Sequence, residues 1–249
     1  MKALITGASS GIGRDMARVL SKMGYDLILV ARRKNRLEEL KDSLPTNVTV
    51  IAMDISSTYN CAKLYNKVKD EDIDILINNA GFGLYGNFTE SKLETELDMI
   101  DLNIKTTHTL TKLFLQDFKK KNKGYILNVA SSAGFMPGPM MATYYATKAY
   151  VLRLTEAINY ELKKSNSDVY IGALCPGPIK TEFERVADVK FTIKKLSSEY
   201  VAEYAIKKMF EKKKIIVPGT MMKLNRVGSK LMPDSLLATF AFNSQKRKG

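Results

Sequence analysis

The 249-residue sequence contains one histidine, His108, two cysteines and no tryptophan. A single histidine excludes histidine-rich metal sites, and no metal is expected; a catalytic triad would have to use that one residue. The cysteines, Cys61 and Cys175, are far apart and form no CxxC motif, which indicates reduced thiols in a reducing compartment. His108 is not expected to be catalytic, and Cys175 is expected to be a buried small residue rather than a nucleophile.

Long hydrophobic runs are also missing. No apolar stretch approaches the roughly 18 residues that a transmembrane helix needs. The chain opens directly on a strand-like segment, residues 2–6, which leaves no room for the apolar core of a signal peptide. These features predict a cytoplasmic protein.

Acidic residues are too few to balance the basic ones. There are 39 Lys and Arg against 26 Asp and Glu, a formal net charge of +13. Such a surplus can attract nucleic acid, an anionic membrane or a phosphorylated small molecule. Many of the lysines stand in runs, which are typical of solvated helix ends, so nucleic acid is not expected as a partner.

Short β-branched segments alternate with amphipathic helical patterns along most of the chain. Strands are predicted at 2–6, 26–31, 48–53, 73–78, 125–130, 168–174 and 215–217, and helices near 12–23, 35–43, 57–69, 91–119, 142–164 and 198–211. Several strands are nearly continuous apolar runs, as in parallel sheets covered on both faces. The alternation predicts an α/β fold: a single-domain, Rossmann-type doubly wound parallel sheet in three αβα layers.

The organisation is one domain, residues 1–218, followed by a basic tail, residues 219–249. Within the domain, residues 181–197 lack periodicity and are expected to form a mobile flap. Apolar residues of the tail recur at helical spacing among the basic ones: Leu224, Val227 and Leu231. The tail therefore predicts an interface helix or a membrane-surface helix, and packing against the body or a partner subunit is favoured.

A glycine-rich segment, Thr6–Gly13, joins the first strand to the first helix. A phosphate must approach the backbone N–H groups at a helix N-terminus, so Cβ atoms have to be absent where the ligand touches. A strand before and a helix after are the context that dinucleotide binding requires. The residues predicted to bind the cofactor here are Gly7, Ser9, Ser10, Gly11, Ile12 and Gly13.

The end of the second strand carries Arg32 and Arg33 where an NAD-binding unit usually has a carboxylate. Guanidinium groups can hold a 2′-phosphate by paired, charge-assisted hydrogen bonds, so the cofactor is predicted to be NADP (NADPH). Asp54, after the third strand, could accept from the adenine amino group or could cap the helix from residue 57.

The Tyr-x-x-x-Lys pattern puts an ammonium one helical turn from a phenol and can lower the phenol pKa. It is weak evidence alone, because it occurs at Tyr59/Lys63, Tyr65/Lys69, Tyr144/Lys148, Tyr160/Lys164 and Tyr204/Lys208. Only Tyr144/Lys148 follows a serine at the end of a predicted strand, Ser131. The carboxyl ends of strands are where open α/β sheets bind ligands.

Taken together, these motifs resemble the short-chain dehydrogenase/reductase family, over nearly the whole domain. Thr6–Gly13 is similar to its TGxxxGxG motif, Asn78–Gly81 to NNAG, Tyr144/Lys148 to YxxxK and Pro176–Thr181 to PGxxxT. The resemblance implies the catalytic residues Asn103, Ser131, Tyr144 and Lys148. It also implies further cofactor contacts from Ile55, Asn79, Ala80, Gly81, Pro176, Gly177, Ile179 and Thr181, and from Tyr144 and Lys148 themselves.

The implied activity is an NADP(H)-dependent oxidoreductase that transfers hydride between nicotinamide and a carbonyl/alcohol substrate. Tyr144 would be the general acid/base, Ser131 would polarise the carbonyl, and Lys148 would lower the Tyr144 pKa and hold the ribose. Asn103 would join Lys148 to solvent through a water. The substrate pocket is expected from residues 181–197, Phe135–Met141 and Phe82–Tyr85, which favour a moderately apolar ketone, aldehyde or acyl compound.

Two other functions stay open: a non-catalytic dinucleotide-binding redox sensor, and a membrane-surface-associated lipid or acyl carbonyl reductase that uses the basic tail. The resemblance also implies a homodimer or homotetramer, paired through the helices at 91–119 and 142–164.

Overall fold

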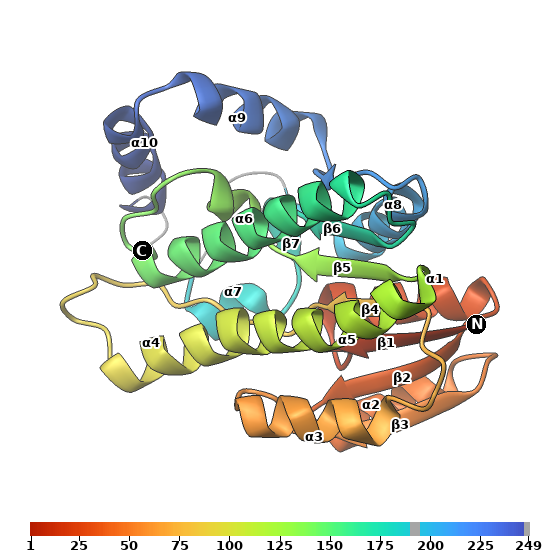
Figure 1. The fold of residues 1–249 in the computed structure, drawn as a ribbon. Helices are drawn as coiled ribbons and strands as arrows, with labels where there is room; N and C mark the ends of the chain where they lie inside the picture. The colour runs from red at the N-terminus through yellow and green to blue at the C-terminus, as the bar shows by residue number, and fades with distance from the viewer. Residues whose placement is uncertain (190–194, 247–249) are drawn as a thin grey trace.

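The structure is a computed structural model that describes residues 1–189 and 195–246 (Figure 1). Its centre is a parallel sheet of seven strands in the order β3-β2-β1-β4-β5-β6-β9. The strands are β1 (Lys2–Thr6), β2 (Asp26–Ala31), β3 (Val48–Ala52), β4 (Ile75–Asn78), β5 (Tyr125–Val129), β6 (Tyr170–Leu174) and β9 (Ile215–Ile216). The order reverses between β1 and β4, which makes that edge the topological switch point.

Helices cover both faces of the sheet. They are α1 (Gly11–Lys22), α2 (Lys34–Asp42), α3 (Thr58–Val68), α4 (Leu93–Ile100), α5 (Thr107–Lys121), α6 (Ala142–Lys164) and α8 (Ser198–Phe210). Successive residues of one strand serve opposite layers: Ala3 and Ile5 pack with α1 and α8, whereas Leu4 packs with α3 and α5. Strands buried on both faces explain the continuous apolar runs, and the predicted Rossmann-type α/β fold is confirmed.

The helix predicted at 91–119 is interrupted. α4 continues through one π-helical segment, η1 (Asp101–Thr106), into α5. A π segment carries an extra residue per turn and is common at functional sites. Apolar periodicity does not reveal the π-helical segment, because the hydrophobic stripe of α4 resumes in α5.

The segment predicted as a flap carries regular structure in its described residues. Residues 181–189 include α7 (Phe183–Ala187), and β8 (Leu196–Ser197) pairs with β7 (Ile179–Lys180) in a small second sheet. Residues 190–194 of the predicted flap lie outside the described residues.

The tail forms two helices, α9 (Thr220–Leu231) and α10 (Asp234–Lys246), which lie over the end of α6 (Figure 1). Met222 of α9 is buried against Gly177, and Leu237 and Ala241 of α10 are buried as well. The tail therefore packs against the body, but not through the residues on which that prediction rested, since Leu224, Val227 and Leu231 stay exposed. Residues 247–249 of the tail lie outside the described part. Within that part, no helix is both long and apolar enough to cross a bilayer.

Candidate active site

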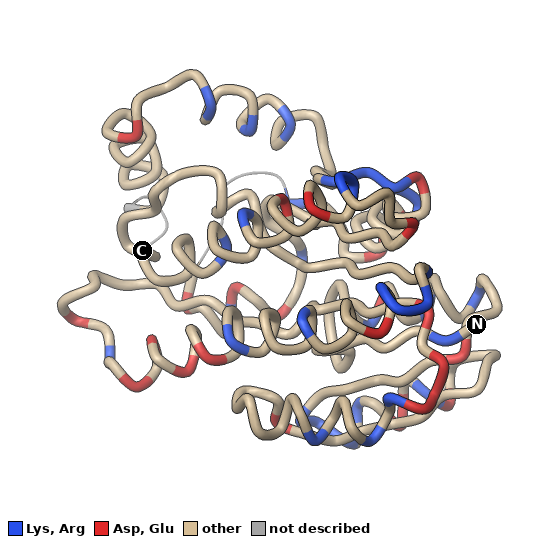
Figure 2. The backbone as a smooth tube through the Cα atoms, in the orientation of Figure 1, with Lys and Arg blue, Asp and Glu red and all other residues tan. Residues whose placement is uncertain are grey.

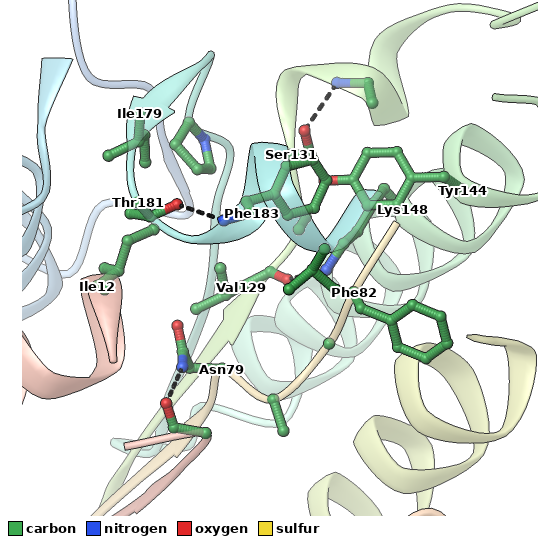
Figure 3. A pocket seen from close by; sticks show the side chains of 18 of the residues that line it. Ile12, Asn79, Phe82, Val129, Ser131, Tyr144, Lys148, Ile179, Thr181 and Phe183 are labelled. Carbon is green, nitrogen blue, oxygen red and sulfur yellow. Dashed lines mark hydrogen bonds between the residues drawn. The ribbon is translucent and has the colours of Figure 1, made fainter. Parts of the chain in front are cut away.

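A cavity of about 560 Å³ lies across the carboxyl ends of the central strands. Every residue predicted to contact the cofactor lines it except Gly13, and so do Ser131, Tyr144 and Lys148 of the predicted catalytic set. Figure 3 shows the close grouping of Ser131, Tyr144 and Lys148 at one end, with Ile12, Asn79 and Thr181 toward the other. The fourth predicted catalytic residue, Asn103, lies behind the cavity wall.

The glycine-rich turn between β1 and α1 is shaped as phosphate binding requires. Gly7 and Gly11 have φ values of +65° and +55°, a left-handed conformation that side chains disfavour. Gly13 has a different function: a Cβ there would stand 2.4 Å from Asn79 Nδ2 and 2.6 Å from the Gly7 oxygen. It allows close packing of the helix on the sheet, which explains why it does not line the cavity.

The two arginines after β2 have different surroundings. The side chain of Arg32 is 75% exposed and lies 4.0 Å from Asp54. Arg33 instead reaches the glycine-rich turn, where Nη2 donates to Ser9 Oγ at 3.0 Å and to Ser10 Oγ at 2.9 Å. Arg33 and the two serines form a cluster of polar donors at the cofactor end.

The structure distinguishes between the two predicted roles of Asp54, an adenine contact and a helix cap. Ser57 caps α3, because its side chain accepts from the Asn60 N–H at 3.1 Å. Asp54 accepts from the Ser56 N–H at 3.0 Å, ahead of the helix, and lines the cavity. The capping alternative is therefore wrong, and the adenine contact stays a prediction.

Tyr144 and Ser131 meet at the other end of the cavity. Ser131 follows β5, accepts from the Ala133 N–H at 3.1 Å and lies close enough to the Tyr144 hydroxyl to lower the pKa of that group. Burial raises the pKa of Tyr144 to about 12, and Ser131 opposes that rise only in part. The phenol is protonated at neutral pH, as a proton donor must be.

Lys148 lies one turn along α6, where its ammonium is buried. Nζ donates to the Val129 carbonyl at 2.9 Å and stands 5.9 Å from the centroid of the Tyr144 ring. Burial lowers the pKa of Lys148 to about 8. The expected lowering of the Tyr144 pKa is not what this geometry gives, because burial of the phenol dominates and the ammonium is directed at a carbonyl.

Asn103 lies in the π-helical segment and holds the loop after β4. Its Nδ2 donates to the Phe82 carbonyl at 2.9 Å and to Thr147 Oγ1 at 3.0 Å, while Oδ1 accepts from the Phe82 N–H at 3.1 Å. A Cβ on Gly81 would stand 2.7 Å from Asn103 Oδ1 and 3.4 Å from Lys148 Nζ. Asn103 therefore fixes the backbone beside the lysine, and its predicted water-mediated role stays a prediction.

The apolar part of the cavity is lined by more segments of the chain than the sequence predicted. Phe82, Met136, Met141 and Phe183 lie in the three segments expected to line it. Sequence reasoning missed the contribution of α9 and α10: Met221, Met222, Asn225, Phe240, Ala241, Ser244 and Gln245. The four-residue spacing of Leu237, Ala241 and Gln245 could have indicated an inward face of α10.

A hydrogen bond anchors α10 to the catalytic helix. Gln245 Nε2 donates to the Tyr145 hydroxyl at 2.8 Å, and the Tyr85 hydroxyl donates to the Gln245 carbonyl at 3.3 Å. The last described turn of the chain thus closes one side of the cavity.

Neither the histidine nor the cavity-side cysteine belongs to this arrangement. His108 Nδ1 is hydrogen-bonded to the Tyr150 hydroxyl at 2.7 Å on the outer surface. Cys175 is fully buried, and burial raises the pKa of its thiol to about 12, which makes it a poor nucleophile.

Comparisons with known proteins agree with this geometry. Residues 1–190 match the family model for short chain dehydrogenases. An uncharacterized oxidoreductase of Staphylococcus epidermidis is 34% identical over 206 residues, which cover 82% of this chain and 88% of that protein.

Solved structures of similar proteins include complexes with both dinucleotides. A short-chain dehydrogenase from Sphingobium yanoikuyae in complex with NADPH is 30% identical, with a TM-score of 0.82 over 93% of this chain and 94% of that one. One from Burkholderia phymatum in complex with NAD is 25% identical, with a TM-score of 0.82 over 90% and 91%. A bulky-bulky ketone specific alcohol dehydrogenase from Comamonas testosteroni is 29% identical, with a TM-score of 0.79 over 93% of each chain.

The switch-point cavity and its glycine-rich turn define a dinucleotide-binding α/β protein. The chain belongs to the short-chain dehydrogenase family and is an oxidoreductase of that family.

Proposed function

We propose that the protein is an NADPH-dependent reductase of apolar carbonyl compounds, with Tyr144 as the proton donor. The observation that carries the proposal is the half-buried Tyr144 phenol placed beside Ser131, in a cavity whose other end holds Arg33, Ser9 and Ser10. The relatives include complexes with NADPH and with NAD, so the preference for NADPH rests on this chain's own arginine.

The residues present fit a dinucleotide with a 2′-phosphate. Left-handed glycines 7 and 11 leave the turn free of Cβ atoms, and Arg33 offers a planar set of N–H donors beside two hydroxyls. Bound NADPH would supply the hydride. Every other part of the reaction falls to this chain's residues.

Three side chains would act on the substrate oxygen and its proton. Ser131 would hydrogen-bond the carbonyl oxygen and hold it beside the phenol, and Tyr144 would donate its hydroxyl proton to that oxygen. Lys148, with its pKa lowered to about 8, can exchange protons near neutrality and would help to restore the phenol. Asn103 would keep the adjoining backbone in place and join this relay to solvent.

The lining of the cavity supports an apolar substrate. Met141, Phe183 and Phe240 come from three separate segments and surround the space beside Tyr144. Binding of such side chains to an apolar ketone, aldehyde or acyl compound is driven by burial of nonpolar surface. A relative described as specific for bulky ketones supports the same class.

A screen of carbonyl compounds for NADPH consumption tests the proposal. We expect turnover of apolar ketones or aldehydes with NADPH and, at equal concentration, slower turnover with NADH. Consumption of neither cofactor, together with tight dinucleotide binding, would instead favour the redox-sensor alternative.

The outer surface of α9 supports a second proposal, contact with an anionic membrane surface. Leu224, Val227 and Leu231 are 72%, 58% and 80% exposed, and the last two also line a hollow that α9 forms with α8 and β9. Basic residues also lie along α9 (Figure 2), among them Lys223 and Lys230. An exposed apolar stripe flanked by lysines fits the headgroup boundary of a bilayer.

The position of the cavity makes that contact relevant to the substrate. Met221 and Phe240 line the cavity and are also 57% and 63% exposed, so the cavity opens beside the apolar face. A lipid-borne carbonyl compound could pass between the two without crossing water. The protein would remain cytoplasmic and bind the surface reversibly.

Vesicle sedimentation tests the membrane proposal. We expect binding to vesicles of phosphatidylcholine with phosphatidylglycerol, and loss of binding in a Leu224→Ser/Leu231→Ser variant. Tyr59→Ser, which changes a 75% exposed side chain on α3, should still bind. No sedimentation of the unmodified protein at low salt would contradict the proposal.

We also propose a homodimer or homotetramer paired through α4, α5 and α6. Leu97 of α4 and Tyr150 of α6 are 49% and 38% exposed, and a second copy could cover them. Sedimentation showing only monomer at micromolar concentration would contradict it.

A further inference from the structure

Glu182 joins the substrate side of the cavity to the cofactor side. It follows Thr181 and precedes α7, and its carboxylate accepts from Arg33 Nη1 at 2.8 Å and from Arg36 Nη1 at 2.9 Å. Arg185 Nη2 adds a third contact at 3.2 Å. The paired residues Glu182 and Arg33 are 149 positions apart, so the contact is made by the fold rather than by neighbours in sequence.

One carboxylate here faces three guanidinium groups. The hydrogen bonds from Arg33 and Arg36 lower the pKa of Glu182 to about 2, so the carboxylate is ionised at every physiological pH. Its side chain is 31% exposed, which leaves the cluster accessible to a ligand. The charge balance of Arg33, Arg36 and Arg185 against Glu182 is positive by two, enough to attract a further anion.

The donors that Glu182 occupies belong to the arginine expected to hold a 2′-phosphate. Arg33 turns one edge to Ser9 and Ser10 and another to Glu182. Carboxylate and phosphate recognise a guanidinium through the same N–H groups, and two anions on one guanidinium repel each other.

We propose that Glu182 is a specificity-determining residue that competes with the cofactor's 2′-phosphate for Arg33 and Arg36. This inference rests on the proposed use of NADPH. A 2′-phosphate displaces the carboxylate, and a cofactor without that phosphate leaves it in place. Glu182 therefore weakens the binding of NADPH without affecting that of NADH.

Displacement of Glu182 would also change the wall at the substrate end of the cavity. The residue after it, Phe183, has its ring centroid 5.3 Å from that of Tyr144, and Val186 one turn on lines the cavity. Release of the carboxylate loosens the start of α7, so the substrate wall responds to which cofactor is bound.

The test measures binding of two fragments that lack nicotinamide, 2′,5′-ADP and 5′-ADP, by titration calorimetry. In Glu182→Gln we expect 2′,5′-ADP to bind roughly fivefold more tightly than in the unmodified protein, the size of an exposed charge interaction. Binding of 5′-ADP should not change. Glu184→Gln is the matched control, because that carboxylate pairs with Lys195 instead.

Amide hydrogen exchange of α7 is a second, independent measurement of the same competition. In the unmodified protein, 2′,5′-ADP should speed exchange in residues 183–187 more than 5′-ADP does, and in Glu182→Gln the two fragments should act alike.

The possible results separate the inference from the proposed function. If the unmodified protein prefers 2′,5′-ADP but Glu182→Gln binds it equally or less tightly, the competition is wrong while NADPH use stands. If neither the unmodified protein nor Glu182→Gln prefers 2′,5′-ADP, the assignment of Arg33 is wrong and this inference is overturned with it.

Discussion

The two ends of the cavity are built in different ways. At the cofactor end, short loops after β1, β2 and β4 place glycines and polar backbone groups at the carboxyl ends of neighbouring strands. At the substrate end, the walls come from α7, α9 and α10, which are distant in sequence from the catalytic helix. The first end depends on local backbone conformation, whereas the second depends on packing between remote segments. Apart from substitutions of Glu182, which joins the two ends, substitutions should therefore affect the two ends separately.

Lys148 lies between the two ends, and replacing it should have the largest effect on stability. Its pKa falls from the usual 10.5 to about 8, so between these values the unfolded chain binds a proton that the folded protein has released. The free energy of unfolding of the unmodified protein should therefore rise with pH over this interval, relative to Lys148→Met, by up to about 3 kcal/mol.

Urea unfolding of both proteins at pH 7, 8 and 9.5 measures this difference. A gap that does not change with pH would mean that Lys148 titrates normally and is not desolvated.

The cofactor end should be sensitive to a single methyl group. Gly13→Ala would place a Cβ 2.6 Å from the backbone oxygen of Gly7, so we expect a loss of about 1–3 kcal/mol in stability and weaker NADPH binding. Gly228→Ala in α9 is the control, since nothing lies within 4 Å of its Cβ position. That variant should be neutral or slightly stabilised in thermal melts. Equal melting temperatures for the two variants would show that the turn is not tightly packed.

The two arginines after β2 should differ in their effect on cofactor choice. We expect Arg33→Met to raise the KM for NADPH roughly tenfold and to leave the KM for NADH unchanged, because it removes a charge-assisted contact to the 2′-phosphate. Arg32→Met, at a side chain that is 75% exposed, should change neither by more than about twofold. Steady-state kinetics with both cofactors distinguishes these results, and a larger effect from Arg32 would reverse the assignment.

The smallest effect is expected at the substrate end. Gln245→Ala removes the hydrogen bond to Tyr145 that anchors α10, worth about 1 kcal/mol. We expect the KM for the carbonyl substrate to rise a few-fold while the Kd of NADPH stays constant. A change in the Kd of NADPH instead would mean that α10 also shapes the cofactor end.

The sequence was enough to predict what depends on local pattern. Periodicity predicts that β1 is buried on both faces. Motifs whose residue types have a physical reason predict the turn at Gly7 and Gly11 and the placement of Ser131 near Tyr144. These features use residues close to one another along the chain or at strand ends that the topology brings together.

What the sequence missed depends on contacts between distant segments. The ion pairs of Glu182 with Arg33 and Arg36 join residues about 150 positions apart, and no pattern within either segment predicts them. The pKa of Tyr144 was expected to fall beside Lys148; it rises because the surrounding chain buries the phenol, an effect that spacing along a helix cannot show. The cavity wall from α10 was missed for the same reason.

The most direct test of the central claim is the activity of Tyr144→Phe beside Tyr160→Phe. Both tyrosines have a lysine one turn on in α6, but Tyr160 is 61% exposed at the surface. We expect Tyr144→Phe to lose at least about 100-fold in NADPH-dependent carbonyl reduction while its Kd for NADPH stays within about twofold, and Tyr160→Phe to remain fully active. Carbonyl reduction by Tyr144→Phe at the unmodified rate would contradict the account.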